Sequence, residues 1–236
     1  MTIAIMSVFG CSDADEWGEH IDGVIDRIHV EQSGAKIIAL TLDICGSNKG
    51  PGIDKELAQY LHDNKIKATL FINKRFIDKN PDDFLALAAS EYFDIQNHGT
   101  QHRPASITGR SAWGIRGFDS KQELIDEIQD AENRIYEMTG RRTTLYRSGT
   151  AFYETAAMKI IHGLGYKVIG FAVNGDHGAS DSADTVEQNL AGAKSGDIII
   201  NHMNHPASGV RDGMIAAIDK WKSEGVQFVF VKDYLQ

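Results

Sequence analysis

The chain has 236 residues, a hydrophobic fraction of 42% and a net charge of −9. This length suits one large domain better than two, and the hydrophobic fraction is enough for a packed core and argues against disorder. No apolar run approaches the ~20 residues of a membrane-spanning helix, so we expect no transmembrane span. The acidic charge disfavours nucleic acid as a partner, because phosphate binding needs concentrated Lys and Arg.

The first segment, residues 1–11, is apolar and free of charge, and it ends in Val8-Phe9-Gly10-Cys11. This end resembles a bacterial lipobox, in which a small residue precedes the cysteine that is acylated. We therefore interpret residues 1–11 as a truncated lipoprotein signal segment with a lipid anchor at Cys11, which predicts an extracytoplasmic, membrane-anchored protein. No basic region precedes the apolar run, so an N-terminal strand and a cytoplasmic location stay open as alternatives.

Residues 12–33 form a polar N-terminal connector in which we expect a modest helical stretch. After Gly34, short apolar runs alternate with amphipathic segments. The apolar runs predict buried strands at 37–42, 67–72, 93–96, 144–146, 167–173, 197–201 and 227–231. Because these runs are continuous rather than alternating, they indicate a parallel sheet that is covered on both faces.

The helical spacing of apolar residues predicts helices at 54–64, 120–139, 154–162, 184–193 and 211–224. The clearest is 120–139, with Ser120 as N-cap, Glu123 three residues later and Gly140 as the stop. Strand and helix alternate about seven times, which favours an α/β fold, a closed or nearly closed βα barrel over residues 34–236.

In a βα barrel the reactive groups lie at the carboxyl ends of the strands. Polar or ionisable residues follow most of the predicted strands here: Asp43, Asn73, Asn97, His98, Arg147, Asn174, Asp176 and His202. Random placement of surface residues would not often produce this series, so we expect a reactive site at this edge of the sheet.

His98 and His102 are spaced i and i+4, which places two imidazoles on one side of a helical turn, where they can hold a metal ion. Arg103-Pro104 would end that turn. The spacing alone is a weak signal, because histidine has several other roles. Its position after a buried strand, opposite Asp43, strengthens the metal prediction.

Asp43 is the candidate general base, since a carboxylate can take the proton of a water whose pKa a metal lowers. Arg147 could keep Asp43 ionised, and the Ser148-Gly149-Thr150 loop could turn backbone N–H groups toward an anion. A turn aspartate and a surface arginine are the alternatives.

His202 is the candidate general acid that protonates a leaving amine, and Asp176 could hold its tautomer and raise its pKa. His177 competes for either role. His205 is interpreted as a loop residue that precedes Pro206.

These residues resemble, in order, the motifs of the polysaccharide deacetylases, the carbohydrate esterase family 4 or NodB-homology domain, over about residues 36–232. Thr41-Leu42-Asp43-Ile44-Cys45-Gly46 is similar to the first motif, Thr-Phe-Asp-Asp-Gly, and His98-Gly99-Thr100-Gln101-His102 to the second, His-Ser/Thr-x-x-His-Pro. Only Arg147 matches the third motif, which has lost its prolines and its aromatic residue. Asp176 loosely matches the fourth, and Ile200-Asn201-His202 matches the fifth.

The resemblance implies a distorted seven- or eight-stranded βα barrel. It also implies a divalent metal, usually zinc, held by His98 and His102, and N-deacetylation of an acetylated amino-sugar glycan such as peptidoglycan, a chitin-like polymer or an exopolysaccharide. Asp43 would be the base and His202 the acid, and a backbone N–H near Thr150 would contact the oxyanion.

Ile44 departs from the family pattern, because the second aspartate of the first motif is the family's third metal ligand. Three protein ligands plus water is the usual catalytic zinc set. Asp43 itself, Cys45, His205 or Asp176 could substitute. If the segment is still extended at Cys45, we expect its side chain to point away from the face that carries Asp43. The site could also work with a weaker metal or none, or the protein could have lost catalysis.

The sequence therefore predicts a metal-dependent hydrolase that removes N-acetyl or O-acetyl groups from an amino-sugar glycan. A catalytically altered glycan-binding domain and an amidase acting on a small molecule are the alternatives. Thr150 and Tyr153 are candidate substrate contacts. Trp113, Phe118 and Phe152 also lie in loops near the predicted site, and these aromatic residues could stack on sugar rings or pack as lids on the core.

Overall fold

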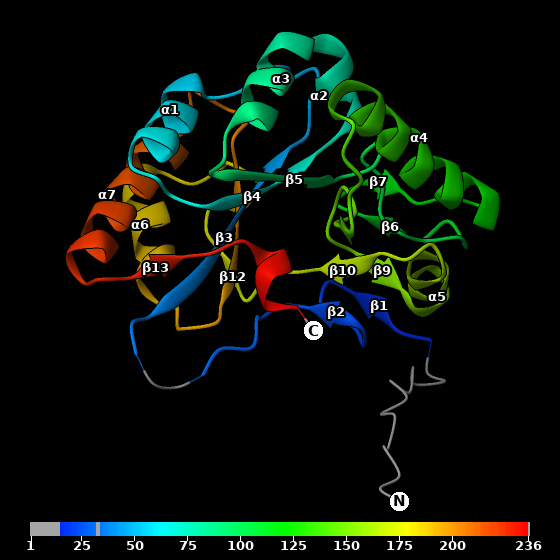
Figure 1. Cartoon of the computed structure of the whole chain (residues 1–236). Coiled ribbons are helices and arrows are strands. Elements are labelled where there is room, and N and C mark those ends of the chain that lie inside the picture. Colours follow the sequence, from blue (N-terminus) through cyan, green and yellow to red (C-terminus); the bar gives the residue numbers. More distant parts are fainter. Residues whose placement is uncertain (1–14, 32–33, 236) are drawn as a thin grey trace, which may run out of the picture.

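A computed structural model describes residues 15–31 and 34–235. Its main element is a curled parallel sheet with helices packed around its outside (Figure 1). The strands follow the order β11–β12–β3–β4–β5–β8–β10–β2, and β13 pairs with β3. The predicted α/β barrel is confirmed, as a distorted half-barrel.

The strands of this sheet are β2 (Val24–Ile25), β3 (Ile37–Ile44), β4 (Ala68–Ile72), β5 (Phe93–Asn97), β8 (Leu145–Tyr146), β10 (Lys167–Ile169), β11 (Val173–Asn174), β12 (Ile198–His202) and β13 (Gln227–Phe228). Two antiparallel pairs lie outside it, β1 (Trp17–Gly18) with β9 (Tyr153–Glu154) and β6 (Ser111–Ala112) with β7 (Ile115–Arg116). The helices are α1 (Lys55–Asp63), α2 (Lys74–Lys79), α3 (Pro81–Ala89), α4 (Lys121–Thr139), α5 (Thr155–Gly163), α6 (Ala183–Ala191), α7 (Val210–Ser223) and the 3-10 helix η1 (Val231–Tyr234).

Two differences from the predicted elements have local causes. The run 167–173 is broken into β10 and β11 at Gly170, whose missing side chain leaves room for Asp26 and whose carbonyl accepts from Arg147. Helices α2 and α3 were not predicted, because α2 is too short to show helical periodicity. Asn73 caps α2 through its side chain, and Pro81 begins α3, where a missing N–H costs nothing.

The expected helical stretch within residues 12–33 is wrong, because the described part of this segment forms β1 and β2 instead. Beyond β2 the chain runs between the two ends of the sheet. Ile28 donates to the carbonyl of Gly196, and Ile198 donates to that of Asp26. These hydrogen bonds with the β12 region satisfy backbone groups that a helix would have paired internally. The segment therefore helps to close the barrel.

The sheet separates two apolar layers. Leu40, Leu42 and Ile44 of β3 belong to the cluster between the sheet and the outer helices. Ala39 packs on the opposite face, in a cluster that includes Val231 of η1. Because successive side chains of a strand alternate between its faces, Thr41 and Asp43 also point into the barrel.

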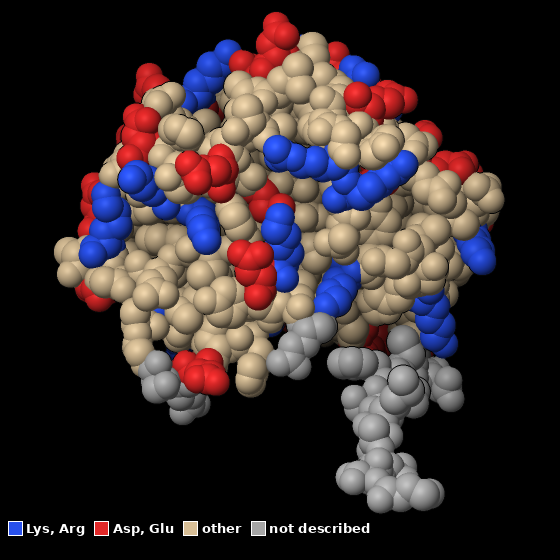
Figure 2. Space-filling view, in the orientation of Figure 1, with Lys and Arg blue, Asp and Glu red and all other residues tan. Residues whose placement is uncertain are grey.

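The predictions on the N-terminus stay untested, since residues 1–11, with Cys11 and the lipobox-like segment, lie outside the described residues. Within the described ranges, no helix is long and apolar enough to cross a bilayer. On the face of the molecule that Figure 2 shows, acidic side chains lie between the basic ones.

Candidate active site and metal centre

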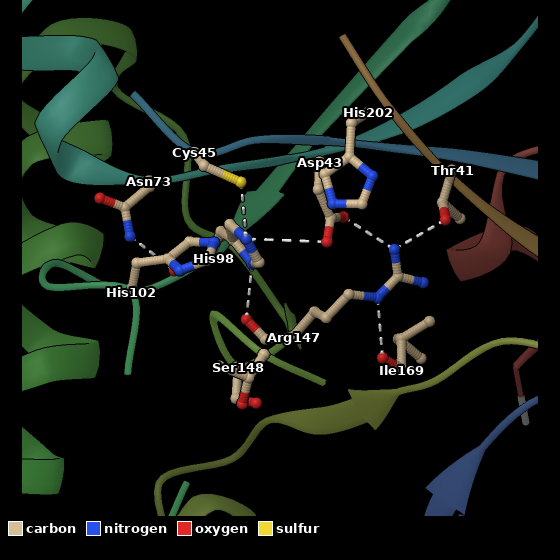
Figure 3. A network of polar contacts seen from close by, with 12 residues as sticks. Thr41, Asp43, Cys45, Asn73, His98, His102, Arg147, Ser148, Ile169 and His202 are labelled. Atoms are coloured by element: carbon tan, nitrogen blue, oxygen red, sulfur yellow. Dashed lines mark hydrogen bonds and ion pairs between the residues drawn. The ribbon is translucent and has the colours of Figure 1, made fainter. Parts of the chain in front are cut away.

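Asp43 forms a buried ion pair with Arg147 inside the barrel. Arg147 Nη1 lies 2.8 Å from Asp43 Oδ1 and also donates to Thr41 Oγ1 at 2.8 Å (Figure 3). Burial alone would raise the pKa of Asp43, but the positive charge of Arg147, with help from His98 and His202, outweighs it and lowers that pKa. Asp43 is therefore ionised at neutral pH, as a general base must be.

The Arg147 guanidinium is fully buried, and each of its three nitrogens donates at least one hydrogen bond. Besides Asp43 and Thr41, it donates to the carbonyls of Ile169 and Gly170. These contacts fix the planar guanidinium group in one orientation. Arg147 therefore holds Asp43 in place and ionised.

His202 and Asp43 are register partners on the neighbouring strands β12 and β3. Nδ1 of His202 lies 2.9 Å from Asp176 Oδ1, and the His202 backbone N–H also donates to this carboxylate. Burial would lower the pKa of His202, but the Asp176 carboxylate raises it above its ordinary value. A proton can thus be kept on His202 near neutral pH, as the role of general acid requires.

Three possible metal ligands meet beside Asp43. Among the described residues, Cys45, His98 and His102 form a group whose ligand atoms all lie within 4.8 Å of one another. Cys45 Sγ is 3.7 Å from His98 Nε2, and the two imidazole rings are nearly perpendicular with centroids 5.0 Å apart. A thiol and two imidazoles are a donor set that suits zinc.

The protonation of the two histidines fits metal binding. His98 Nδ1 lies 2.9 Å from the carbonyl of Arg147, so Nδ1 carries the hydrogen and Nε2 is left with a lone pair toward the cluster. Burial lowers the pKa of His98 and places that of His102 well below its ordinary value, which keeps both rings neutral. Burial also raises the pKa of the Cys45 thiol, a cost that a bound cation would offset.

The expected direction of Cys45 is wrong. His98 Nε2 has the Cys45 thiol at 3.7 Å and Asp43 Oδ2 at 3.6 Å, so the thiol and the carboxylate point the same way. Residues two apart in an extended segment share a face, and this signal was already present in the sequence. Ile44, between them, lies in the outer apolar cluster and is no ligand. His205 and Asp176 lie outside the ligand group.

The expected helical turn over 98–102 is also wrong, because this segment is a loop in which Gly99 and His102 have φ of 71° and 62°. Glu127 of α4 organises the loop. Its buried carboxylate accepts from the backbone N–H groups of Gln101 and His102. A side chain at position 99 would overlap this carboxylate, so the loop needs glycine there. Glu127 carries no motif signal, since its role depends on packing between distant segments.

The loop after Arg147 lies directly against His102. A side chain at Gly149 would overlap the His102 backbone. Among the described residues, no acceptor is paired with the backbone N–H of Thr150, while the Thr150 hydroxyl accepts from Phe152. Tyr153 has no exposed surface, and its hydroxyl accepts from Ser148. In this conformation Tyr153 therefore supports the loop instead of contacting a substrate.

The remaining candidate site residues differ in the exposure of their side chains. The side chain of His177 is 58% exposed and pairs with Asp181 at 2.6 Å. Phe118 is buried in the core, whereas Trp113 is 73% exposed. Phe118 therefore packs in the core, whereas sugar stacking by Trp113 stays a prediction.

A family profile described as polysaccharide deacetylase matches residues 31–169. Curated proteins give no match. Among solved structures, Bacillus subtilis PdaA, a family 4 carbohydrate esterase, is similar with a TM-score of 0.72 and 19% identity, covering 89% of this chain and 84% of that chain. The peptidoglycan deacetylase PdaC from Bacillus subtilis has a TM-score of 0.69 and 21% identity, covering 85% of this chain and 90% of that chain.

BA3943 from Bacillus anthracis is a further similar structure, described as a family pseudoenzyme. Its TM-score is 0.68 at 18% identity, covering 86% of this chain and 66% of that chain. At these identities the structural likeness shows a shared fold. The similar structures include proteins that are described as enzymes and one that is described as a pseudoenzyme.

Proposed function

Because the chain belongs to the polysaccharide deacetylase family, we propose that it is a metal-dependent hydrolase that removes N-acetyl, or O-acetyl, groups from an amino-sugar glycan. One observation carries the proposal. An ionised carboxylate, Asp43, and a histidine with a raised pKa, His202, are register partners beside a group of possible metal ligands. Pairs whose surroundings push their pKa values apart are typical of acid and base partners.

Cys45, His98 and His102 would hold the metal, in place of the ligand set with an aspartate at position 44. The chemistry that a divalent ion such as zinc supplies when bound there is polarisation of the acetyl carbonyl and a lower pKa for the attacking water. The donor types support this assignment, since thiolate and imidazole both favour zinc.

The chain's own groups provide the proton transfers. Asp43, kept ionised by Arg147, takes the proton of the attacking water. His202, whose Nδ1 is held by Asp176, donates a proton from Nε2 to the leaving amine or alcohol. The backbone N–H of Thr150 is available to the developing oxyanion, in a loop that touches His102.

Acetate release from N-acetylated chito-oligosaccharides tests the proposal, together with the metal content of protein purified without added metal. Asp43→Asn and His202→Ala should each reduce acetate release by about 100-fold or more, the usual effect of a lost acid or base. Asp63→Asn and His62→Ala, in the outer helix α1, are the matched controls and should keep it. Unchanged release by the first pair would refute the assigned roles.

A second candidate is a glycan-binding domain without catalysis. Ile44 favours it, because this residue replaces a metal ligand of the family and packs in the core. Oligosaccharide binding without metal or acetate release would select this alternative. Hydrolysis confined to small amides in a substrate panel would instead select an amidase acting on a small molecule. We also propose an extracytoplasmic location, which cell fractionation tests.

A further inference from the structure

Trp113 is unusually exposed for a large aromatic residue. It is 73% exposed, compared with 42% for Leu85 and 44% for Tyr136, the other large hydrophobic side chains exposed within the described ranges. Tyr136 is moreover covered by the guanidinium of Arg142, 3.8 Å from its ring centroid. An isolated exposed hydrophobic residue needs no explanation, but the way in which Trp113 is held does.

Trp113 lies at the tip of the β6–β7 hairpin, where Trp113 and Gly114 both have positive φ, 53° and 76°. The two-residue turn between the paired Ala112 and Ile115 imposes this conformation, which a bulky residue rarely adopts. The base of the hairpin is firmly anchored. The buried carboxylate of Glu154 accepts from Ser106, Ile107 and Thr108.

Phe152 supports the Trp113 ring. The two rings meet edge to face with centroids 5.6 Å apart, and Trp17 packs on Phe152 at 5.4 Å. The backbone carbonyl of Phe152 accepts from Ala105 and from the Ser148 hydroxyl. Phe152 is therefore held by its neighbours and supports one side of the exposed indole, which reduces the entropy lost when a ligand stacks on the other side.

The loop that carries Phe152 also borders the candidate active site. Ala105 follows the ligand His102 by three residues, and Gly149, in the same loop as Phe152, abuts the His102 backbone. Thr150, whose N–H is available to an oxyanion, lies two residues before Phe152. Trp113 is thus linked to the candidate active site through the loop that runs from Arg147 to Phe152.

We propose that Trp113, held by Phe152, is a sugar-stacking subsite for a ring of the same glycan chain outside the ring that reaches Asp43. The inference rests on the proposed function and specifies its substrate as an oligomer. The electron-rich face of an indole is complementary to the C–H groups on the face of a pyranose ring, and Trp offers the largest such area. A monosaccharide or small amide would not reach this subsite.

Isothermal titration calorimetry with the N-acetylglucosamine tetramer and dimer tests the inference. Trp113→Ala should raise the Kd of the tetramer by about tenfold, as expected for loss of a binding hot spot, and that of the dimer by less than twofold. Trp113→Phe should retain most of the tetramer affinity. Leu85→Ala, another exposed hydrophobic residue, is the matched control and should change neither Kd.

Kinetics separate this inference from the proposed function. Trp113→Ala should raise KM for the tetramer with little change in kcat. If wild type releases acetate but Trp113→Ala binds the tetramer as tightly as wild type, the subsite is refuted and the function stands; Trp113 would then serve another partner. If wild type neither binds these oligomers nor releases acetate, the function fails and the subsite fails with it.

Discussion

The Cys45 thiol lies 3.7 Å from His98 Nε2 and belongs with His98 and His102 to one group of possible metal ligands. It shares the interior face with Asp43, two residues earlier. A thiolate and two imidazoles can complete a three-residue zinc site without any carboxylate ligand.

Cys45→Ala should therefore greatly weaken metal binding. Loss of a residue that only hydrogen-bonds to a metal ligand lowers metal affinity about 10–100-fold. Because Cys45 would be a ligand itself, we expect zinc affinity to fall by at least this much. Mass spectrometry of the metal content after dialysis measures this. Cys11→Ala is the control for the loss of a cysteine as such, and equal zinc in both variants would exclude Cys45 as a ligand.

Removing Arg147 should destabilise the fold strongly. Arg147→Ala leaves the buried Asp43 carboxylate without its partner, which typically costs about 3–5 kcal/mol. Urea denaturation measures the free energy of unfolding of each variant. Arg116→Ala, which breaks an exposed ion pair with Asp119, should change the free energy of unfolding by only about 0–1 kcal/mol. Similar losses in both variants would contradict the assigned role of Arg147.

The pH profile of kcat/KM should be broad. Asp43 must be deprotonated and its pKa is lowered, so the acid limb falls below 3.8. His202 must be protonated and its pKa is raised, so the alkaline limb lies above 6.5. Asp176→Asn should move the alkaline limb to lower pH, because the carboxylate that stabilises the His202 cation is gone. Asp181→Asn, which removes the partner of His177, should leave the limb in place.

Glu127 should support the metal site without touching the metal. Glu127→Gln removes part of the carboxylate that accepts from Gln101 and His102. Loss of such an outer partner typically lowers metal affinity about 10–100-fold, measurable by competition with a chromogenic chelator. Glu123→Gln, at the start of the same helix, is the control. If Glu127→Gln binds the metal with wild-type affinity, the loop keeps its conformation without Glu127.

The local pattern of the sequence was sufficient for much of the fold and for the order of the site. Apolar runs that end at Asp43, His98 and His202 identify buried parallel strands, and the carboxyl ends of such strands meet at one edge. Helix α4 was equally clear, because its cap and its stop are local signals. Short elements such as α2 give no such period, and they were missed.

The tertiary structure decided how distant segments meet. The sequence by itself determined that Asp43, His98, Arg147 and His202 lie at the carboxyl ends of buried strands, although Asp43 and His202 still belong to β3 and β12. Only packing showed that Glu127 holds the ligand loop, that residues 26–28 fill the gap between the ends of the sheet, and that Trp113 is exposed while Tyr153 is buried. Periodicity reports a residue's position within its own strand or helix, whereas these contacts join backbone groups far apart in the chain, which no local pattern encodes.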